Sequence, residues 1–439
     1  MIFLRWLYPG LGFKRWILVI MFGLFCAAEG LAVAQGSELI SLLERPVLNL
    51  FLGYTGEPLR ILSGAFIVLV GILIMGLGFS RLMRNVLTGL VPGAGSHWGE
   101  KLLLQYNLKK GPSIVAIGGG TGLSTLLRGL KEVTSNITAI VTVTDDGGSS
   151  GRLRGDLGML PPGDIRNCLV ALADRESALE RLFNYRFSQG GELAGHSLGN
   201  LLLAGLTQET GNLALAVQEV SKILAVRGQV LPVTLDNVVL AGEMHDGRIV
   251  KGETNIVSDP GRIKRVYLEP AHCTPLQEAI DAILAADAII LGPGSLYTSV
   301  IPNLLVPGIT EAIRNSKAKT FYICNIMTQP GETDGYTASR HLKAIIKHCG
   351  PGVIDKVIVN NENISPKLKE KYQAQGAKPV KLDENNFRKL GVEVIQYPLC
   401  AQHDLARHDP GKTLRVLMEE IQGHTAYLFG YAKRTSGDK

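Results

Sequence analysis

The chain has 439 residues, of which 46% are hydrophobic and 19% charged, and its formal net charge is +6. This length accommodates one large α/β domain and an additional module. Aromatic residues make up only 6% of the chain and do not interleave with a basic stripe, so the composition argues against nucleic acid as a partner. The six cysteines are scattered and form no C-x-x-C pair, which is typical of reduced, mostly buried thiols and argues against a disulfide framework or a zinc site.

Two apolar segments predict an N-terminal membrane region over residues 1–90, with helices over about 16–34 and 61–79. The second segment carries no charge, and a helix needs about 20 residues to cross the hydrocarbon core. The first segment is either a membrane helix that forms a hairpin with the second or a signal peptide, because Ala32-Val33-Ala34 has the small-x-small pattern of a cleavage site. We favour the hairpin.

The charges around these segments predict their orientation. In the link 35–58, three of the four charged residues are acidic, whereas Arg81, Arg84 and Lys101 follow the second segment. The positive-inside rule therefore places everything after Phe79 in the cytoplasm, with the chain held in the plasma membrane by its contact with the lipid bilayer. Residues 91–111, with their Pro, Gly and Ser, read as a linker.

The stretch 113–154 predicts a βαβ unit, the core of a Rossmann-like, open and mostly parallel sheet. The apolar run Ile114–Ile117 lies between Pro112 and a glycine turn, as expected of a strand buried on both faces. Leucines at helical spacing follow from Leu123, and Ile137–Thr144 forms a second apolar strand. A second glycine-rich loop is expected directly after it, at the edge of the sheet where ligands bind.

The first glycine turn is expected to hold a phosphate group. Gly118, Gly119, Gly120 and Gly122 let the backbone approach a ligand closely, and the N–H groups of the following helix point at it. The turn does not fit a dinucleotide fingerprint, because the sixth position of that motif must be glycine and is Leu123 here. It does not fit a P-loop either, because that motif needs a lysine directly after its glycines and none follows until Lys131.

Polar residues at the ends of neighbouring elements are candidates for the same edge. Asp145 and Asp146 follow the second strand, and Asp164 is expected to cap a helix over 165–173. His196 precedes a buried helix that Ser197 is expected to cap; the histidine is either a turn residue or a ligand contact.

The rest of the chain predicts a small antiparallel insertion and a second ligand turn. Residues 226–268 alternate like antiparallel strands, with an Asp246-Gly247 turn, and Lys264 at their end either reaches an anion or is solvated. A second glycine turn, Gly292–Ser295, follows the strand 288–291. The tail, 398–439, is expected to hold one helix preceded by a polar surface loop around His403 and His408.

Six motifs in this order resemble a known family. They are Gly118-Gly-Gly-Thr-Gly-Leu-Ser, Thr144-Asp-Asp-Gly-Gly-Ser-Ser-Gly-Arg-Leu-Arg, Pro161-Pro-Gly-Asp-Ile-Arg-Asn, Gly195-His-Ser-Leu-Gly-Asn, Leu291-Gly-Pro-Gly-Ser-Leu-Tyr-Thr-Ser-Val and Met327-Thr-Gln-Pro-Gly-Glu-Thr. Residues 112–397 resemble the YvcK proteins, called gluconeogenesis factors, within the superfamily of CofD-like 2-phospho-L-lactate transferases. The YvcK proteins as a class are soluble, so residues 1–110 are an addition to the pattern.

The resemblance implies a Rossmann-like domain that binds a UDP-sugar such as UDP-N-acetylglucosamine, with a role in carbon metabolism and cell shape. It implies that Asp145 lies near an acceptor or a metal. Together with the residue-based candidates, the predicted nucleotide- and phosphate-binding residues are Gly118, Gly119, Gly120, Thr121, Gly122, Leu123, Asp145, Asp146, Asp164, Arg166, Asn167, His196, Asn200, Gly292, Gly294, Ser295 and Asn325.

Three functions remain open at this point, in order of preference. The first is a membrane-tethered nucleotide-sugar sensor that regulates an unknown protein partner and has no catalytic residue, since no nucleophile with a general base is evident. The second is a phospho-group transferase with a nucleoside-diphosphate-linked donor, in which Asp145 and Asp146 hold Mg²⁺. The third is a nicotinamide-dependent redox enzyme, which the broken fingerprint disfavours. A homodimer is a further expectation.

Overall fold

The computed structural model describes residues 14–35, 57–90, 103, 106–174, 177–402 and 406–423. It divides the chain into two compact units, 1–106 and 107–439. Most of the predicted linker lies outside the described residues, as do His403 and Asp404.

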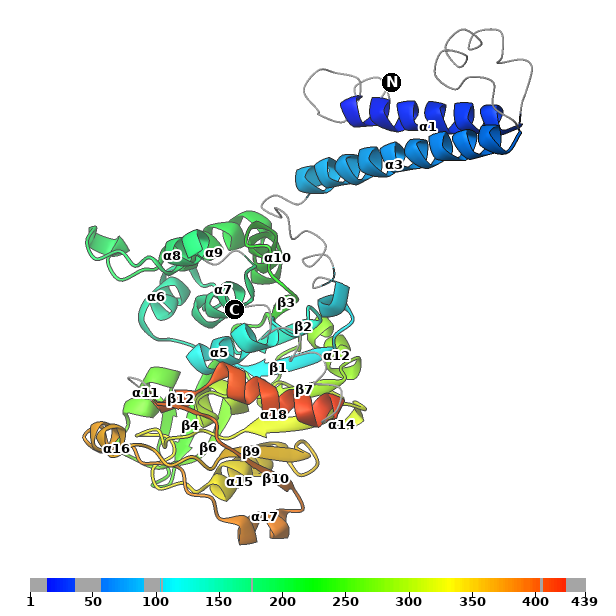
Figure 1. Ribbon diagram of the computed structural model, residues 1–439. Coiled ribbons are helices and arrows are strands. Elements are labelled where there is room, and N and C mark those ends of the chain that lie inside the picture. The colour runs from blue at the N-terminus through cyan, green and yellow to red at the C-terminus, as the bar shows by residue number, and fades with distance from the viewer. Residues whose placement is uncertain are drawn as a thin grey trace. The chain divides into compact units, whose positions relative to one another are not determined.

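The first unit contains two long apolar helices that pack against each other, α1 (Lys14–Gln35) and α3 (Glu57–Leu90) (Figure 1). Both are long and apolar enough to cross a membrane, over Arg15–Gln35 and Ile61–Asn85. α3 extends beyond the predicted 61–79 at both ends, because the charged and polar residues that flank the apolar run also form good helix.

Glycines spaced seven residues apart bring the two helices into backbone contact. A Cβ added at Gly71 would lie 2.6 Å from the amide nitrogen of Ala27, and one at Gly30 would lie 2.6 Å from that of Val68. A Cβ added at Gly64 would lie 2.6 Å from the Gly30 carbonyl oxygen. Small residues at a seven-residue spacing are typical of closely packed membrane helices, so these glycines define the hairpin.

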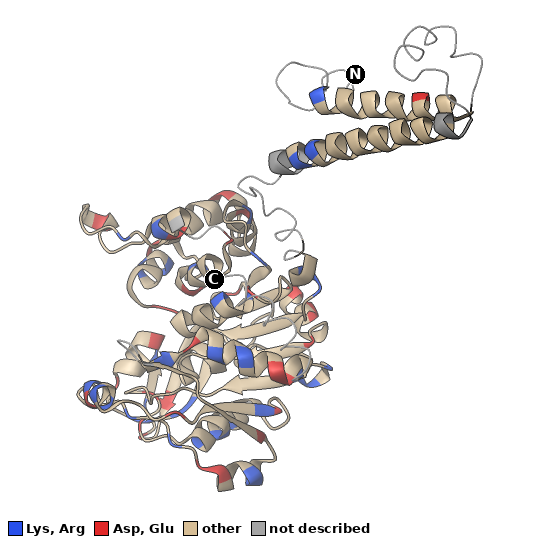
Figure 2. Cartoon of the chain, viewed as in Figure 1, with Lys and Arg blue, Asp and Glu red and all other residues tan. Residues whose placement is uncertain are grey.

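Among the side chains that the structure describes in the first unit, the basic ones lie toward one end of the helix pair and the acidic one toward the other (Figure 2). The guanidinium groups of Arg15 and Arg81 lie 5.4 and 5.6 Å from the ring centre of Trp16. The start of α1 and the end of α3 are therefore neighbours, and the positive charges of Arg15 and Arg81 lie at the same end of the helix pair.

The second unit is built on a seven-stranded parallel sheet in the order β10-β9-β8-β7-β1-β2-β3. This confirms the predicted Rossmann-like fold. The strands of this sheet are β1 (Ile114–Gly118), β2 (Ile137–Val141), β3 (Gln229–Pro232), β7 (Ala288–Leu291), β8 (Lys319–Ile323), β9 (Lys356–Asn360) and β10 (Glu393–Tyr397). Its central strands are fully buried, which explains their continuous apolar sequences.

Helices cover both faces of the sheet. Because parallel crossovers are right-handed, the helices between β1 and β3 lie on one face and those between β7 and β10 on the other.

The described helices of the second unit, from α5 onward, are α5 (Gly120–Leu130), α6 (Gly148–Leu157), α7 (Gly163–Leu172), α8 (Ser177–Asn184), α9 (Leu198–Thr210), α10 (Leu213–Ile223), α11 (Glu253–Ser258), α12 (Gln277–Leu284), α13 (Ile301–Leu305), α14 (Ile309–Asn315), α15 (Ala338–Cys349), α16 (Pro366–Gln373), α17 (Glu384–Leu390) and α18 (Pro410–Gln422), with the short turns η3 (Gly191–Leu193) and η4 (Leu296–Val300). α18 packs on α5 (Figure 1).

The antiparallel insertion is smaller than expected. It is a three-stranded sheet of β4 (Val239–Met244), β5 (Ile249–Lys251) and β6 (Ile263–Glu269), with the predicted Asp246-Gly247 turn between β4 and β5. β3, which was expected to belong to it, pairs with β2 in the main sheet. An alternating edge strand has the same pattern in either kind of sheet, so the sequence did not separate them.

Three further expectations are corrected. The glycine-rich segment after Asp146 is a helix, α6, in which a Cβ at Gly151 would lie 1.9 Å from the Asp146 carbonyl oxygen. Asp164 lies in the first turn of α7, whose N-cap is Pro162. The tail before α18 forms a hairpin of β11 (Cys400–Gln402) and β12 (Ala406–His408) rather than a loop. All six cysteines are free, and all but Cys26 are buried.

Candidate functional site

Both glycine turns begin at the topological switch point of the sheet. The neighbouring strands β1 and β7 are the centre of the sheet. From β1 the chain proceeds outward to β2 and β3, and from β7 it proceeds in the opposite direction to β8, β9 and β10. A crevice forms at the carboxyl ends of strands where the order reverses, and ligands of open α/β sheets bind there. The turn Gly119–Gly122 follows β1, and Gly292–Ser295 follows β7.

The two turns lie against each other. A Cβ at Gly122 would lie 2.4 Å from the Pro293 carbonyl oxygen, and one at Gly294 would lie 3.3 Å from the Gly119 carbonyl oxygen. Only glycine allows this approach at Gly122. The backbones of both turns therefore form one continuous surface.

A cavity of about 370 Å³ opens on this surface, and we call it the switch-point cavity. It takes in seven of the predicted residues, Gly119, Gly120, Thr121, Gly122, Gly294, Ser295 and Asn325. Its other lining residues are Thr125, Pro293, Ser299, Ile326, Met327, Thr328, Gln329, Pro330, Tyr372, Gln375, Ala377, Ala406, Arg407 and His408. Hydroxyl and amide groups dominate its polar part, and the lining residues that the structure describes include no carboxylate.

The backbone of the first turn is available to an anion. α5 begins at Gly120, and its N-cap, Gly119, supplies no side-chain cap, so the N–H groups of Thr121 and Gly122 have no intrahelical acceptor. Gly120 has a φ of +64°, and a Cβ there would meet nothing closer than the Ser299 hydroxyl at 3.9 Å. The side chain of Leu123 is fully buried in the core, and this residue is not part of the lining.

The predicted acids lie beside the cavity rather than in its lining. Asp164 accepts a hydrogen bond from the Gly120 N–H, and burial followed by the charge of Asp145 raises the pKa of Asp164 to about 6. Burial and the charges of Asp145, Asp164 and Glu332 raise the pKa of Glu253 to about 9. Asp145 itself accepts from the Gly147 N–H at 2.9 Å. A cluster of carboxyl groups therefore flanks the first glycine turn.

Asp146 has a structural partner. One of its carboxylate oxygens accepts from the backbone N–H and the hydroxyl of Thr254, at 2.9 and 2.7 Å. It thereby fastens the start of α11 to the segment between β2 and α6. Its contact with a ligand remains a prediction.

The remaining predicted residues form a largely buried polar network that joins α6, α7 and α9. The Ser149 hydroxyl lies 2.9 Å from Nδ1 of His196 and accepts from Asn200 Nδ2 at 3.0 Å. Arg166 donates to the Ser197 hydroxyl and, at 2.7 Å, to Asn167 Oδ1. Ser197 also caps α9, as expected. None of these residues lines the switch-point cavity. Gly118 and Gly292 lie behind the two turns and are not lining residues either.

Several residues of the site carried no recognisable sequence signal. Arg407 and His408 reach the cavity from β12, and Gln329 donates to the Ser295 hydroxyl at 2.7 Å. His408 is held by the Cys324 carbonyl oxygen, and burial lowers its pKa to about 4, so it is neutral. Glu253 lies in the insertion, whose sequence gave no reason to place a carboxyl group at the sheet edge.

A metal ion would have few protein ligands here. Among the described residues, no three His, Cys, Asp or Glu side chains are grouped so that they could hold one. Mg²⁺ needs only one or two carboxylates plus the phosphates of a bound donor. The carboxyl groups of Asp145 and Asp164 lie beside the phosphate-sized turn, where the charge of Asp145 helps to raise the pKa of Asp164, and they fit that donor set. Asp145 as a ligand stays a prediction.

Comparison with known proteins decides the family. The profile of the 2-phospho-L-lactate transferase CofD family matches residues 114–400. The chain belongs to the CofD family. Within the CofD family it is similar to the gluconeogenesis factors of Halalkalibacterium halodurans (55% identity; 71% of this chain and 97% of the relative) and Bacillus subtilis (54%; 71% and 98%). The resemblance to the YvcK proteins is thus confirmed.

A crystal structure of a protein from Bacillus halodurans supports the fold. It superimposes with a TM-score of 0.69 at 55% identity and covers 70% of this chain and all of its own. A relative from Nostoc sp. is 47% identical over 95% of this chain and 92% of its own length. That coverage requires most of residues 1–106 to be matched. Residues 1–106, expected as an addition to the YvcK pattern, therefore have a counterpart in this longer relative.

Proposed function

We propose that the protein is a membrane-tethered regulator whose cytoplasmic domain binds a UDP-sugar, and that UDP-N-acetylglucosamine is the first ligand to test. The observation that carries the proposal is the contact between the two glycine turns at the switch point. Together they expose backbone N–H groups over a length of surface that suits the two phosphates of a diphosphate bridge.

The lining of the switch-point cavity supports a neutral sugar and a base at the two ends of that bridge. The side chains of Thr125, Asn325 and Gln329 supply hydroxyl and amide groups, which are the usual partners of sugar hydroxyls and a uracil edge. Tyr372 supplies an aromatic surface for a ring, and Arg407 supplies one positive charge for the phosphates.

Regulation rather than catalysis is favoured by what lines the cavity. Its described lining includes no carboxylate, and its one histidine, His408, is neutral and bound to a backbone carbonyl. A nucleophile would have no positioned general base in this cavity. We infer that ligand binding changes the activity of a protein partner, and the names of the relatives point to carbon metabolism as the regulated process.

The tether is the α1–α3 hairpin. Its outward apolar side chains, such as Leu18, Leu62 and Phe66, are more than half exposed, which suits contact with lipid. Arg81 and Arg84 at the end of α3 favour a cytoplasmic second unit. Ala34, at the suggested cleavage site, packs on Gly64, which favours retention of the first helix.

The second candidate function is a phospho-group transferase. The carboxyl cluster of Asp145, Asp164 and Glu253 beside the first turn favours it, because Mg²⁺ bound there would neutralise both the cluster and a diphosphate donor.

Calorimetric titration of the full chain in detergent separates the two functions. The regulator predicts micromolar binding of UDP-N-acetylglucosamine that is unchanged by removing Mg²⁺ and yields no product. Strict dependence on Mg²⁺ with turnover of a GDP-linked donor would establish the transferase. An absence of UDP-sugar binding under both conditions would overturn the proposed ligand.

A further inference from the structure

A second, larger cavity lies outside the site already described. Its volume is about 760 Å³, and we call it the cationic cavity because basic side chains dominate its charge. The basic lining residues are His245, Arg262, Lys264, Arg340, Lys343 and Lys347.

The positive charges come from two opposing elements. Arg340, Lys343 and Lys347 are three and four residues apart on α15, so they lie on one face of that helix. Arg262 and Lys264 belong to the segment that leads into and begins β6. A ligand between α15 and β6 would therefore meet cations from both sides.

Two of these cations have no protein partner. Arg262 and Lys343 make no side-chain hydrogen bond or ion pair with any residue that the structure describes. Arg340 makes one long contact, 3.4 Å from the Gly335 carbonyl oxygen. Lys264 is paired with Glu243 at 2.6 Å, and Lys347 donates to a backbone carbonyl. At least three positive charges thus remain available to a ligand.

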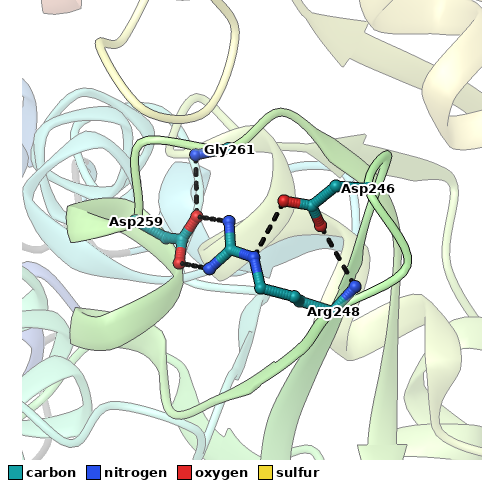
Figure 3. Close-up of polar contacts among 4 residues, drawn as sticks. All are labelled: Asp246, Arg248, Asp259 and Gly261. Carbon is teal, nitrogen blue, oxygen red and sulfur yellow. Dashed lines mark hydrogen bonds and ion pairs between the residues drawn. The ribbon is translucent and has the colours of Figure 1, made fainter.

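The acids of the lining do not cancel these charges. Both carboxylate oxygens of Asp259 are held by Arg248, at 2.7 and 2.9 Å, and one of them also accepts from the Gly261 N–H (Figure 3). Arg248 in turn donates to Asp246 at 2.8 Å. Arg248, which Asp246 and Asp259 share, offsets part of their negative charge and fastens the 259–261 turn to the β4–β5 hairpin, so that the rim of the cavity is held in place.

The other two acids are also engaged. Glu332 is buried, its carboxylate accepts from the backbone N–H of Tyr297 at 3.2 Å, and burial raises its pKa to about 7. Asp334 accepts from the Gly331 N–H at 2.8 Å. In a concave site, the unpaired cations therefore set the sign of the potential.

The cavity also has an aromatic part. The hydroxyl groups of Tyr297 and Tyr336 are 2.8 Å apart, and their rings pack edge to face with centroids 6.4 Å apart. Both residues line the cavity. This surface suits the organic part of a ligand, whereas a simple inorganic ion would leave it uncovered.

We propose that the cationic cavity binds a small metabolite carrying two or more phosphate groups. Several unpaired cations on opposite walls suit separated anionic groups, and the volume lies within the range of about 300–1,000 Å³ that is typical of metabolite sites. Phosphate oxygens would supply the acceptors that Arg262 and Lys343 lack.

The two cavities share a wall, so occupancy of one is expected to affect the other. Pro330 lines both cavities. On one side of it Gln329 holds Ser295 of the switch-point cavity, and on the other Glu332 holds the start of η4, which follows that same serine. The bound metabolite would act as an effector of the first site; this part alone rests on the proposed UDP-sugar function.

The test uses the full chain in detergent and inorganic tripolyphosphate, a probe with neither base nor sugar. A Gly120→Ala background weakens phosphate binding in the switch-point cavity, so that calorimetry reports mainly the cationic cavity. In that background we expect one site, weakened roughly tenfold or more by Arg262→Ser with Lys343→Ser. The matched control is Arg388→Ser with Lys389→Ser on α17, which removes the same charge from an exposed surface and should leave binding unchanged.

Two results would overturn the proposal. One is that tripolyphosphate does not bind in the Gly120→Ala background. The other is that the two double variants bind tripolyphosphate equally, whether or not both have lost affinity. Failure of UDP-N-acetylglucosamine to bind the wild-type chain would instead contradict the proposed function and leave this result standing. The effector role is tested by titrating the UDP-sugar with and without tripolyphosphate, in the wild type and in Arg262→Ser/Lys343→Ser. A shift in affinity that only the wild type shows is expected, and equal behaviour of the two would remove that role.

Discussion

The Pro293 carbonyl oxygen faces Gly122 so closely that a Cβ on this glycine would lie 2.4 Å from it. Gly122 follows β1 and Pro293 follows β7, so this contact joins the two halves of the sheet at the switch point. The joint surface of the two turns, and with it the switch-point cavity, depends on the missing side chain.

Gly122→Ala should therefore destabilise the protein. The added methyl group must displace one turn, and overpacking of this kind costs about 1–3 kcal/mol of unfolding free energy. Urea unfolding measures the change. Gly155→Ala on exposed α6, where a Cβ would meet nothing within 4 Å, is the control and should be neutral or slightly stabilising. Equal stability of Gly122→Ala and the wild type would show that the turns are not in contact.

Gly120→Ala should weaken UDP-N-acetylglucosamine binding by roughly tenfold or more, because its Cβ projects into the space proposed for the phosphates. Its positive φ adds about 1 kcal/mol of strain. Gly391→Ala provides the matched control, since Gly391 has a φ of +68° and open space around it on α17. The two variants should lose similar stability, and only Gly120→Ala should lose affinity. A similar affinity of both variants for UDP-N-acetylglucosamine would show that the phosphates do not bind at this turn.

Asp164→Asn should stabilise the protein at pH 7.5. The pKa of Asp164 is about 6 in the folded chain and 3.8 ordinarily, so the folded state binds the proton more tightly and stability falls as the pH rises between these values. Asparagine carries no charge and still accepts from the Gly120 N–H, so we expect a gain of about 1–2 kcal/mol at pH 7.5 that disappears near pH 4. Thermal unfolding at both pH values checks it. A loss of stability at pH 7.5 would mean that the carboxylate is compensated by a group such as a bound cation.

Gly71→Leu should separate α1 from α3 without preventing membrane insertion, because the side chain would collide with the backbone of Ala27. Gly76→Leu is the control, since a Cβ at Gly76 meets nothing within 4 Å on the same helix. In a Cys26→Ser background, oxidative cross-linking of Val19→Cys to Gly78→Cys reports the contact between the helices. Cross-linking should fall strongly with Gly71→Leu alone. Equal cross-linking in both variants would contradict the glycine interface.

The sequence specified the parts of the fold that local physics determines. The buried strand Ile114–Ile117, the glycine turn after it and the helical leucines from Leu123 were predictable because period and turn chemistry agreed. The same patterns could not place α6, where backbone contact with Asp146 selects glycines inside a helix. Nor could they separate β3 from the insertion.

The backbone turns of the candidate site could be predicted from the sequence, whereas its lining side chains could be predicted only in part. Turns that follow β1 and β7 must meet if those strands are neighbours, and this brought Gly120 and Ser295 together. Arg407 and His408 were missed because β12 reaches the cavity through long-range packing that no local spacing encodes. The sequence left His196 open as a turn residue or a ligand contact; the structure gives it a bond to Ser149, and its contact with a ligand stays a prediction.

The most direct test of the central claim is an experimental structure of the protein with UDP-N-acetylglucosamine bound. We predict density for the diphosphate against the backbone of Gly119–Gly122 and Gly292–Ser295, with the sugar and the base in the switch-point cavity. A structure in which the nucleotide lies elsewhere and both glycine turns remain empty would contradict the account.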